Sequence, residues 1–397
     1  MTESLTITAT EMRSINRTAV LDLLRRESPI SRALIARRLN VSLPTVMRIV
    51  DELLKEGLVQ PLSDTQWSGG RRRTLLEFNS EEHVVIGIDL SGTHMFGAIA
   101  DFGGNILEEV DFGHRSREGE ENYSFLVELI EQLLASPKTT GKKVWGIGVG
   151  AAGVTLHKEG MVVWSHSLNW RDYPLREKLS VRFGLPVMVD NDVNLAALGE
   201  LWYGAGQNMH DMVLLVVGTG IGAGIIINGA LYRGAHEASG EVGYLLPGRE
   251  FLGKRYENFG ALESQASVTG IIARARYALQ GTRSASALEE LTLEDFFKAA
   301  RGGEGWAKPI LEETLDYLAM GISSVIAYFD PELIVLGGDL IRSADWLLEP
   351  VIQRVVGTVP YCPRIVSSGL GSRAVVMGAV THVLHNSADF YTVTKLS

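Results

Sequence analysis

The 397-residue chain has the composition of an ordinary globular protein, with 46% hydrophobic and 21% charged residues, and can hold two or three domains. Its single cysteine, Cys362, excludes an intrachain disulfide framework and a cysteine-rich zinc cluster. The first residues, MTESLTITAT, lack the basic start and apolar core of a secretory signal, and the longest apolar run, 212–227, is shorter than the roughly 20 residues of a spanning helix. We therefore expect a cytoplasmic protein with no membrane partner.

The net charge of −10 is unevenly distributed along the chain. Residues 1–80 carry 12 Lys and Arg against 9 Asp and Glu, whereas residues 81–397 carry 25 against 38. A basic segment joined to an acidic one predicts two functions in one chain, because phosphate polymers are attracted to the basic part.

The basic segment shows the hydrophobic spacing of three helices. The stretch MRSINRTAVLDLLRRES predicts the first, with Ile15, Ala19, Leu23 and Leu24 on one face. A short second helix carries Leu34, Ile35 and Leu39, and Asn40 is its expected C-cap. A third helix is expected to begin at Ser42, with Pro44 in its first turn, and to bury Val46, Ile49, Val50 and Leu53.

The close spacing of the second and third helices fits a helix-turn-helix, although an ordinary three-helix bundle is the alternative. On the third helix, Ser42, Thr45 and Arg48 lie off the apolar stripe, free to contact a DNA groove. Directly afterwards, GLVQPLSDTQWSGGRRRTLLEFN predicts a hairpin with Arg71, Arg72 and Arg73 beside its tip. A basic hairpin at this place is typical of the wing of a winged helix-turn-helix, where arginines contact phosphates or the minor groove.

The acidic segment contains the same pattern twice. Both HVVIGIDLSGTHMFGAIAD and, about 130 residues later, DMVLLVVGTGIGAGIIINGALY join two apolar strands through a glycine- and threonine-containing turn. Such turns suit phosphate oxygens, although a tight hairpin needs glycine in any case. Asp89 precedes the first turn and could hold the Mg²⁺ of a nucleotide. The repetition predicts a duplicated domain with a cleft between its halves. The candidate nucleotide-phosphate residues are Asp89, Gly92, Thr93, Gly218, Thr219 and Gly220.

Two further stretches carry polar or glycine motifs. GVGAAG at 148–153 has the spelling of a dinucleotide site, but the β-branched residues and Gly160 that follow predict no helix, so we reject that interpretation. In LPVMVDNDVNLAALGELWYGAG, a buried strand leads to Asp190, Asn191 and Asp192, with Asn194 opening a helix. These side chains could bind a polyol and accept a hydroxyl proton, or could merely cap the helix.

The order of these motifs resembles the ROK family of repressors, open reading frames and sugar kinases, over nearly the whole chain. The matching stretches are IGIDLSGTH, VDNDVNLAALGE, VVGTGIGAGIIINGALY, SGEVGY, GALES and DPELIVLGGDL. The resemblance implies a winged helix-turn-helix (α+β) at 1–80, followed by a duplicated α/β fold of the actin/hexokinase-like, or ribonuclease H-like, type. Its first lobe would span 81–200 and its second lobe 201–397.

The resemblance also implies roles for single residues. Asp192 matches the base that deprotonates the sugar hydroxyl in the kinases, and Asn191, Glu241 and Glu263 match residues that hold sugar hydroxyls. In SHSLNWRDYPL, either Ser167 or Asn169 stands where the kinases have an asparagine that contacts the sugar, and we take Asn169 as the candidate.

The chain departs from the family pattern at two places. The family's zinc-binding histidine and three cysteines are replaced here by Tyr244, Lys254, Tyr256 and Ala261, so we expect no structural zinc. Packing of Tyr244, Tyr256 and Phe259 would hold this loop instead, and Tyr244 should alter sugar preference. In the first phosphate loop, His94 replaces a lysine and Ser91 a glycine, which should weaken ATP binding.

These features predict a sugar-responsive transcriptional regulator, a repressor, that binds double-stranded DNA and a monosaccharide and requires no cofactor. A homodimer or homotetramer on a palindromic operator is expected from the symmetry of such proteins. The stretch LEETLDYLAMGISSVIAYF is either core or dimer surface, and we favour core. The alternative function is an ATP- and Mg²⁺-dependent sugar kinase that retains a DNA-binding head, with Asp192 as its catalytic base.

Overall fold

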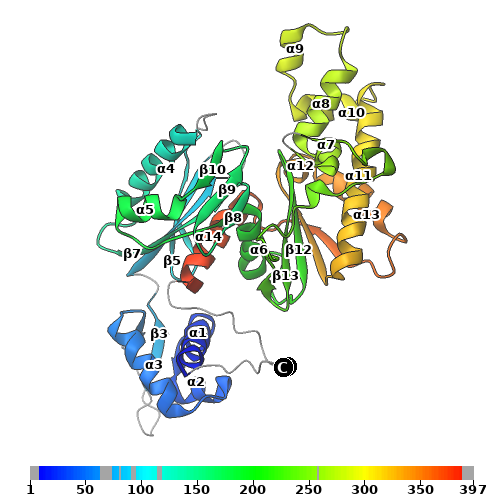
Figure 1. Cartoon of the computed structure of the whole chain (residues 1–397). Helices are drawn as coiled ribbons and strands as arrows, with labels where there is room; N and C mark the ends of the chain where they lie inside the picture. Colours follow the sequence, from blue (N-terminus) through cyan, green and yellow to red (C-terminus); the bar gives the residue numbers. More distant parts are fainter. Residues whose placement is uncertain are drawn as a thin grey trace.

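The computed structural model describes residues 9–62, 74–79, 82–90, 95–113, 119–256 and 259–386, which form an N-terminal head and a two-lobed body (Figure 1). The head elements are α1 (Ala9–Glu27), β1 (Ile30–Ser31), α2 (Arg32–Leu39), α3 (Leu43–Lys55), β2 (Val59–Pro61) and β3 (Leu75–Phe78). Strand β3 pairs antiparallel with both β1 and β2, giving the order β1-β3-β2. Three helices with a small antiparallel sheet constitute a winged helix-turn-helix, as expected from the sequence.

The predicted caps of the helix-turn-helix are confirmed. Asn40 ends α2 in the left-handed conformation, with φ 52°, and Ser42 caps α3 by accepting a hydrogen bond of 3.3 Å from the Thr45 N–H. The buried residues of α3 are those that the spacing predicts, Val46, Ile49, Val50 and Leu53. Strand pairing of Val59 with Phe78 confirms the hairpin, whereas its tip with Arg71, Arg72 and Arg73 lies outside the described residues.

The two lobes of the body repeat one sheet topology. The first-lobe sheet has the order β11-β7-β4-β5-β6 and the second the order β14-β13-β12-β15-β16. In each, the central strand, β4 or β12, pairs with one antiparallel neighbour, which pairs antiparallel with the edge strand beyond it. The two strands on the other side are parallel to the central strand. This correspondence confirms the duplicated ribonuclease H-like fold.

The first lobe surrounds its sheet with helices and a small additional sheet of order β10-β9-β8 (Figure 1). Its elements are β4 (His83–Leu90), β5 (Phe96–Asp101), β6 (Ile106–Asp111), α4 (Gly119–Leu134), β7 (Lys143–Ala151), β8 (Val154–Leu156), β9 (Met161–Ser165), β10 (Trp170–Tyr173), α5 (Leu175–Phe183), β11 (Val187–Asn191) and α6 (Asp192–Tyr203). Strand β8 follows β7 almost directly, so the GVGAAG motif opens no helix, as predicted.

The second lobe carries most of the helices. Its strands are β12 (Met212–Val217), β13 (Ile221–Ile227), β14 (Ala230–Leu231), β15 (Leu333–Gly337) and β16 (Arg364–Ser367). Its α-helices are α7 (Ala261–Ala266), α8 (Val268–Ala278), α9 (Ala285–Glu289), α10 (Leu293–Arg301), α11 (Ala307–Phe329), α12 (Asp339–Ser343) and α13 (Leu348–Val355). Short 3-10 helices are η1 (Val242–Tyr244), η2 (Arg249–Phe251), η3 (Asp345–Leu347) and η4 (Gly371–Arg373).

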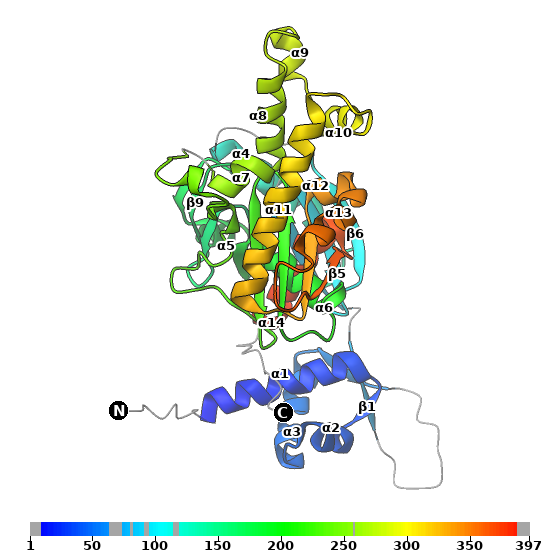
Figure 2. The ribbon, with the colours of Figure 1, turned by 90° about the vertical axis from the view of Figure 1, so that its right-hand side faces the viewer.

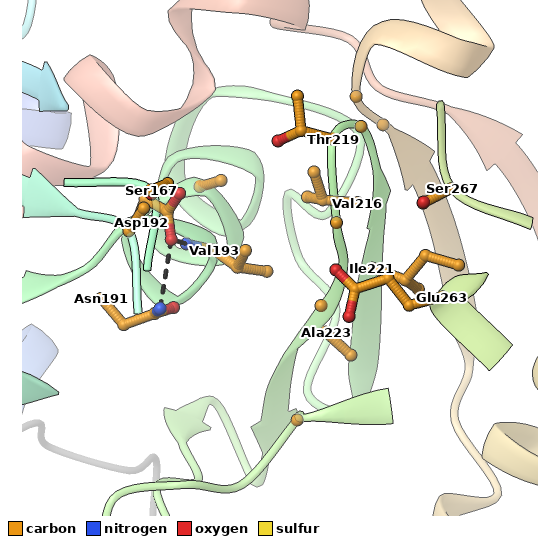
Figure 3. Close-up of a pocket in the computed structure, with 18 of the residues that line it drawn as sticks. Ser167, Asn191, Asp192, Val193, Val216, Thr219, Ile221, Ala223, Glu263 and Ser267 are labelled. Atoms are coloured by element: carbon orange, nitrogen blue, oxygen red, sulfur yellow. Dashed lines mark hydrogen bonds between the residues drawn. The ribbon is translucent and has the colours of Figure 1, made fainter. Parts of the chain in front are cut away.

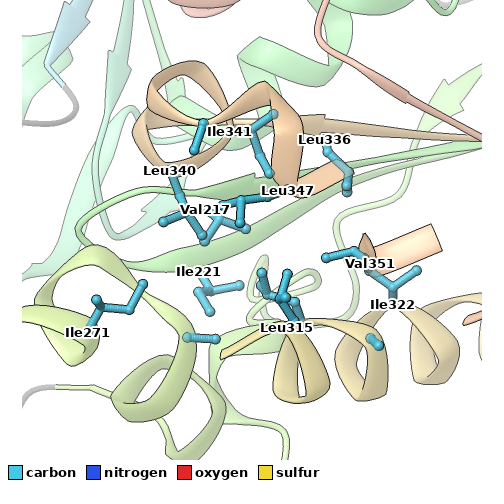
Figure 4. Close-up of a cluster of buried hydrophobic side chains, with 14 of the residues drawn as sticks. Val217, Ile221, Ile271, Leu315, Ile322, Leu336, Leu340, Ile341, Leu347 and Val351 are labelled. Atoms are coloured by element: carbon cyan, nitrogen blue, oxygen red, sulfur yellow. The ribbon is translucent and has the colours of Figure 1, made fainter. Parts of the chain in front are cut away.

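The long helix α11 belongs to the core of the second lobe. Its residues Leu315 and Ile322 face the sheet residues Val217 and Ile221, and α13 closes the cluster with Val351 (Figure 4). The predicted stripe of α11 is therefore buried, as the sequence favours. Within the described part of the chain, no helix is both long and apolar enough to span a bilayer.

The last helix, α14 (Ala374–Asn386), returns from the second lobe and packs between α6 and the first-lobe sheet (Figure 1). Glycines make this close packing possible. A Cβ on Gly87 of β4 would lie 2.7 Å from the Val376 carbonyl oxygen, and one on Gly148 of β7 would overlap the Ala379 carbonyl. On the opposite side, a Cβ on Gly378 would overlap the Leu195 carbonyl of α6. Backbone therefore contacts backbone on both sides of α14.

The head shares one hydrophobic core with the first lobe. Phe78 of β3 stacks on Phe102 at a centroid distance of 6.1 Å, and Phe102 also contacts His83 and Trp145. The same cluster continues to Val380 and Val383 of α14. Figure 2 shows the head lying against one end of the body. Head, first-lobe sheet and α14 are thus joined by continuous apolar contact.

The close packing of α14 predicts that Gly378→Ala destabilises the fold. In an ordinary helix interior, alanine is about 1 kcal/mol more favourable than glycine. Here the added methyl overlaps the Leu195 carbonyl, and overpacking of this kind costs about 1–3 kcal/mol or more. The substitution should therefore destabilise the protein although alanine is the better helix former. Chemical denaturation should show a lower free energy of unfolding. The control Gly305→Ala, where a Cβ meets open space, should change stability little.

Candidate functional site

A cavity of ≈ 560 Å³ lies between the lobes and contains residues from both. In Figure 3, Asn191 and Asp192 approach it from the first lobe, and Thr219 and Glu263 from the second. The duplicated fold explains this placement, because the turns that follow the strands of the two sheets face one another across the cleft. The cavity residues that the sequence predicted are Asp89, Asn191, Asp192, Gly218, Thr219, Gly220, Glu241 and Glu263.

On the first-lobe wall, the end of β11 and the start of α6 position the polar residues. The Asn191 side-chain oxygen caps α6 by accepting from the Asn194 N–H at 3.0 Å, so α6 begins two residues earlier than expected. The Asn191 amide donates to Asp192 Oδ1 at 3.1 Å, and the Val193 N–H donates to the same oxygen at 2.9 Å. The capping and ligand-binding interpretations are therefore compatible, because Asn191 caps the helix while it lines the cavity.

On the second-lobe wall, carboxyl groups are crowded. Burial within the cleft, and then the charge of Glu263, raises the pKa of Glu241. Burial also raises the pKa of Glu263, although N–H donors of Gly260 and Ile221 oppose this. A Cβ on Gly220 would overlap Oε1 of Glu263, so the glycine of the second turn makes room for this carboxyl. The wall is thus a set of hydrogen-bond acceptors held in a confined space.

Tyr244 completes this wall at the position of the family's histidine. Its side chain is 52% exposed and lines the cavity, and burial followed by the charges of Glu241 and Glu263 raises its pKa. The remaining zinc positions, Lys254, Tyr256 and Ala261, supply no thiolate or imidazole, so these residues do not fit a zinc ion. The Tyr256 ring instead packs against the Phe259 ring, with 5.8 Å between the two ring centroids.

The cavity also contains residues of the predicted phosphate loops. Asp89 and the turn Gly218–Gly220 line it together with Asp339 and Arg342, which form an ion pair. Gly92 and Thr93, with the substituted positions Ser91 and His94, lie outside the described residues. The sequence predicts that Asn191, Asp192, Glu241 and Glu263 bind a polyol, and we refer to their part of the cavity as the polyol end.

Two residues of the polar stretches are placed away from the cavity. Asn169 is exposed with φ 52° and does not line it, whereas Ser167 does, so Ser167 is the better placed of the two alternatives in this loop. Asp190 is completely buried behind the wall, where its carboxylate lies 2.6 Å from Arg233. It is in no position to contact a polyol.

The candidate DNA surface is the exposed face of α3. Ser42 and Arg48 are exposed, and Thr45 is partly covered, with its hydroxyl 2.7 Å from that of Ser42. Leu43 and Met47 are also exposed, at 44% and 47%, and neither is among the residues predicted for this surface. Exposed apolar side chains on such a helix can contact thymine methyl groups, so these two extend the candidate surface.

Four arginines of the described head are paired with acids. Arg13 of α1 forms an ion pair of 2.5 Å with Glu52 of α3, and Arg17 of α1 forms one of 2.6 Å with Glu56, the residue that caps the C-terminus of α3. Arg32 similarly binds Asp51, and Arg38 binds Glu27. Arg48 forms no ion pair with another described residue. The surplus positive charge of the head is therefore concentrated on a few side chains, which increases the expected importance of the wing arginines.

The segment from Tyr232 to Glu241 supplies further cavity residues. Ser239 and Gly240 stand in the matched stretch SGEVGY but are not among the predicted site residues, and Glu237 precedes that stretch. Glu237, Ser239 and Gly240 line the cavity beside the predicted Glu241. Their signal was weak, because the segment GAHEASG has no hydrophobic period and is compatible with an ordinary loop.

Comparison with known proteins agrees with this architecture. The ROK family model matches residues 85–386, and a model described as winged helix-turn-helix DNA-binding matches residues 13–60. The chain is 31% identical to the xylose repressor of Caldicellulosiruptor bescii over 391 residues, covering 96% of this chain and 98% of that protein.

Two solved structures are similar to the fold. A ROK family transcriptional regulator, a homologue of the Escherichia coli Mlc protein, has a TM-score of 0.81 at 24% identity, covering 95% of this chain and 98% of that one. A ROK family glucokinase from Streptomyces griseus, in complex with glucose and AMPPNP, has a TM-score of 0.61 at 28% identity, covering 75% and 98%. Fold and site together define a DNA-binding head on a sugar-kinase-like body. The chain belongs to the ROK family, and its head is a winged helix-turn-helix DNA-binding domain.

The carboxyl cluster predicts a pH-dependent effect of Glu241→Gln on stability. A carboxyl whose pKa is raised in the folded state stabilises the fold below its unfolded pKa, and this contribution is lost as pH rises through the folded pKa. At pH 8 this contribution is reduced or lost, and the variant, which has no carboxyl to ionise, should unfold at a higher temperature than the parent. The difference should shrink as the pH is lowered toward 4. Thermal unfolding across this range measures it, with the exposed Glu159→Gln as control. A difference that is the same at every pH would contradict the assignment.

Proposed function

We propose that this protein is a sugar-responsive transcriptional repressor that acts in the cytoplasm, where its DNA partner lies. The supporting observation is that a head of the winged helix-turn-helix class shares its hydrophobic core with the lobe that carries half of the inter-lobe cavity. The xylose repressor similarity supports both parts of this proposal, the DNA and the sugar.

The charge of the cavity favours a neutral monosaccharide as effector. Its acidic lining residues are Asp89, Asp192, Glu237, Glu241, Glu263 and Asp339. The cavity also contains one arginine, Arg342, which forms an ion pair with Asp339. Sugar hydroxyls can donate hydrogen bonds to carboxylates, whereas a sugar phosphate or sugar acid would be repelled at the polyol end. D-xylose and D-glucose, the sugars named for the relatives, are suitable first probes.

Helix α14 is the proposed route from the cavity to the head. Its first residues, Ala374 and Val375, line the cavity, and Val380 and Val383 contact the core shared with the head. Because backbone packs directly on backbone along its length, a shift of α6 or of the second lobe displaces α14 as a rigid body. A sugar that prefers one cleft arrangement thereby changes the population of head arrangements, which is the requirement for allosteric coupling.

We further propose that the protein works as a homodimer or homotetramer on a palindromic operator, because a single helix-turn-helix contacts only a half-site. No cofactor is needed for this function. In the described part of the chain, no group of three His, Cys, Asp or Glu side chains is arranged to hold a metal ion. ATP and Mg²⁺ would be required only if the chain also phosphorylates its sugar.

The wing is tested with the variant Arg71→Ala/Arg72→Ala/Arg73→Ala. We expect weaker binding to a DNA site obtained by in vitro selection, with the slope of log K against log salt reduced by about 1 for each phosphate that is no longer neutralised. Fluorescence anisotropy at several salt concentrations measures both quantities, and sugar binding should be unchanged. The control variant Arg171→Ala/Arg182→Ala/Arg301→Ala removes the same charge from the exposed surface of the body. Equally weakened DNA binding in the two variants would contradict a direct DNA contact of the wing.

The kinase alternative is separated from this proposal by sugar-dependent ATP hydrolysis. As a regulator, the protein should bind a sugar and change its DNA affinity without turnover. Phosphorylation at ordinary enzymatic rates, abolished by Asp192→Asn, would instead assign a catalytic function to the cleft.

A further inference from the structure

The segment Tyr232–Glu241 is a loop of the second lobe that contacts the first lobe, and we refer to it as the strap. At both ends it is bonded to β13 of its own lobe, through Tyr232 N–H to Ile225 and through Ala223 N–H to Gly240. Between these anchors the Ser239 N–H donates to the Arg233 carbonyl oxygen, which closes the strap into a compact loop. The strap therefore projects two side chains, those of Arg233 and Glu237, into the first lobe.

Arg233 forms an ion pair with Asp190, the residue before the cavity residue Asn191. Its guanidinium lies 2.6 Å from Asp190 Oδ2, with the Asp190 side chain fully buried and that of Arg233 17% exposed. The other oxygen, Asp190 Oδ1, accepts from the Asn191 N–H at 2.7 Å. One carboxylate thus joins the strap to the strand end from which Asn191 and Asp192 enter the cavity.

Glu237 forms a second connection between the lobes. Its Oε2 accepts from the His157 N–H at 2.6 Å and lies 2.8 Å from the ring Nδ1 of the same residue, which belongs to the first lobe. Glu237 itself adopts φ 54°, a conformation that non-glycine residues rarely take.

The surroundings make Arg233 the cation that neutralises Asp190. His382 of α14 is buried near this pair, and burial lowers its pKa to about 4, with Asp190 opposing and Arg233 and His157 reinforcing the effect. It is therefore neutral near pH 7. Removing Arg233 would leave a buried carboxylate without a cationic partner.

We propose that Arg233 is a positioning residue for sugar binding: its ion pair with Asp190 holds the strap residues Ser239, Gly240 and Glu241 opposite Asn191 and Asp192. The two walls of the polyol end come from different lobes, so their separation has to be fixed by a contact between lobes. The Arg233–Asp190 pair provides such a contact next to Asn191, and the Glu237–His157 contact provides a second one. This inference rests on the proposed sugar-binding function.

The test compares Arg233→Met, Asp190→Asn/Arg233→Met and the parent chain. Arg233→Met should lower the melting temperature, because it leaves Asp190 unpaired, and should weaken the affinity for D-xylose and D-glucose by about tenfold or more. The double variant removes the buried charge, while the amide oxygen introduced at position 190 can still accept from the Asn191 N–H. Its melting temperature should recover, but its sugar affinity should remain weak because the strap is no longer fixed.

Two readouts accompany this series. Calorimetry gives the sugar dissociation constants, and hydrogen exchange of the peptide 232–241 reports strap docking whether or not a sugar binds. Faster exchange is expected in both variants. The control Arg354→Met removes an arginine paired with Glu312 and Asp316 within the second lobe, and it should leave sugar affinity unchanged.

The outcomes separate the two proposals. Recovery of sugar affinity together with melting temperature in the double variant would show a purely structural role and overturn the positioning proposal, as would unchanged exchange of the strap. Absence of binding of either sugar to the parent chain would count against these effectors in the proposed function, while hydrogen exchange would still decide whether Arg233 docks the strap.

Discussion

The structure depends on the contact of α14 with its neighbours, in which helix backbone meets strand backbone and helix backbone with almost no side chain between them. Gly87 and Gly148 on one side and Gly378 on the other permit this approach. A helix held in this way cannot adjust locally, because every shift produces overlap. The same helix begins at the cavity and ends in the core shared with the head. One tightly packed element therefore extends from the cavity between the lobes to the hydrophobic cluster that the first lobe shares with the head.

Two electrostatic interactions in the cleft have opposite signs: carboxyl groups in the cavity repel one another, and an ion pair attracts the two lobes. The polyol end gathers carboxyl groups, and their burial and mutual repulsion raise the pKa of Glu241. Behind the walls, Arg233 and Asp190 provide attraction between the lobes through a buried ion pair. Bound sugar hydroxyls would satisfy the carboxyl groups and favour the arrangement in which both walls contact the ligand. The balance between these terms is what a sugar can shift, and α14 is positioned to transmit the shift.

Much of this architecture could be predicted from the sequence, because it depends on local rules. The caps Asn40 and Ser42, the buried stripe of α3 and the duplicated hairpins follow from hydrophobic period and turn chemistry. The roles of Asp190 and Arg233 could not be predicted in this way. Their contact joins residues far apart in the chain, and a carboxylate beside Asn191 and Asp192 has the same sequence signal whether it faces a ligand or a buried arginine. The choice between Ser167 and Asn169 likewise depended on backbone geometry.

The most direct test of coupling through α14 is the sugar dissociation constant of free and DNA-bound protein, compared between the parent and Val383→Ala. This substitution removes two methyl groups from the end of α14 that contacts the shared core, far along the helix from the cavity. Val351→Ala makes the same change in the buried core of the second lobe. If α14 carries the signal, DNA should change sugar affinity less in Val383→Ala than in the parent or in Val351→Ala. An unchanged ratio in Val383→Ala would contradict the account.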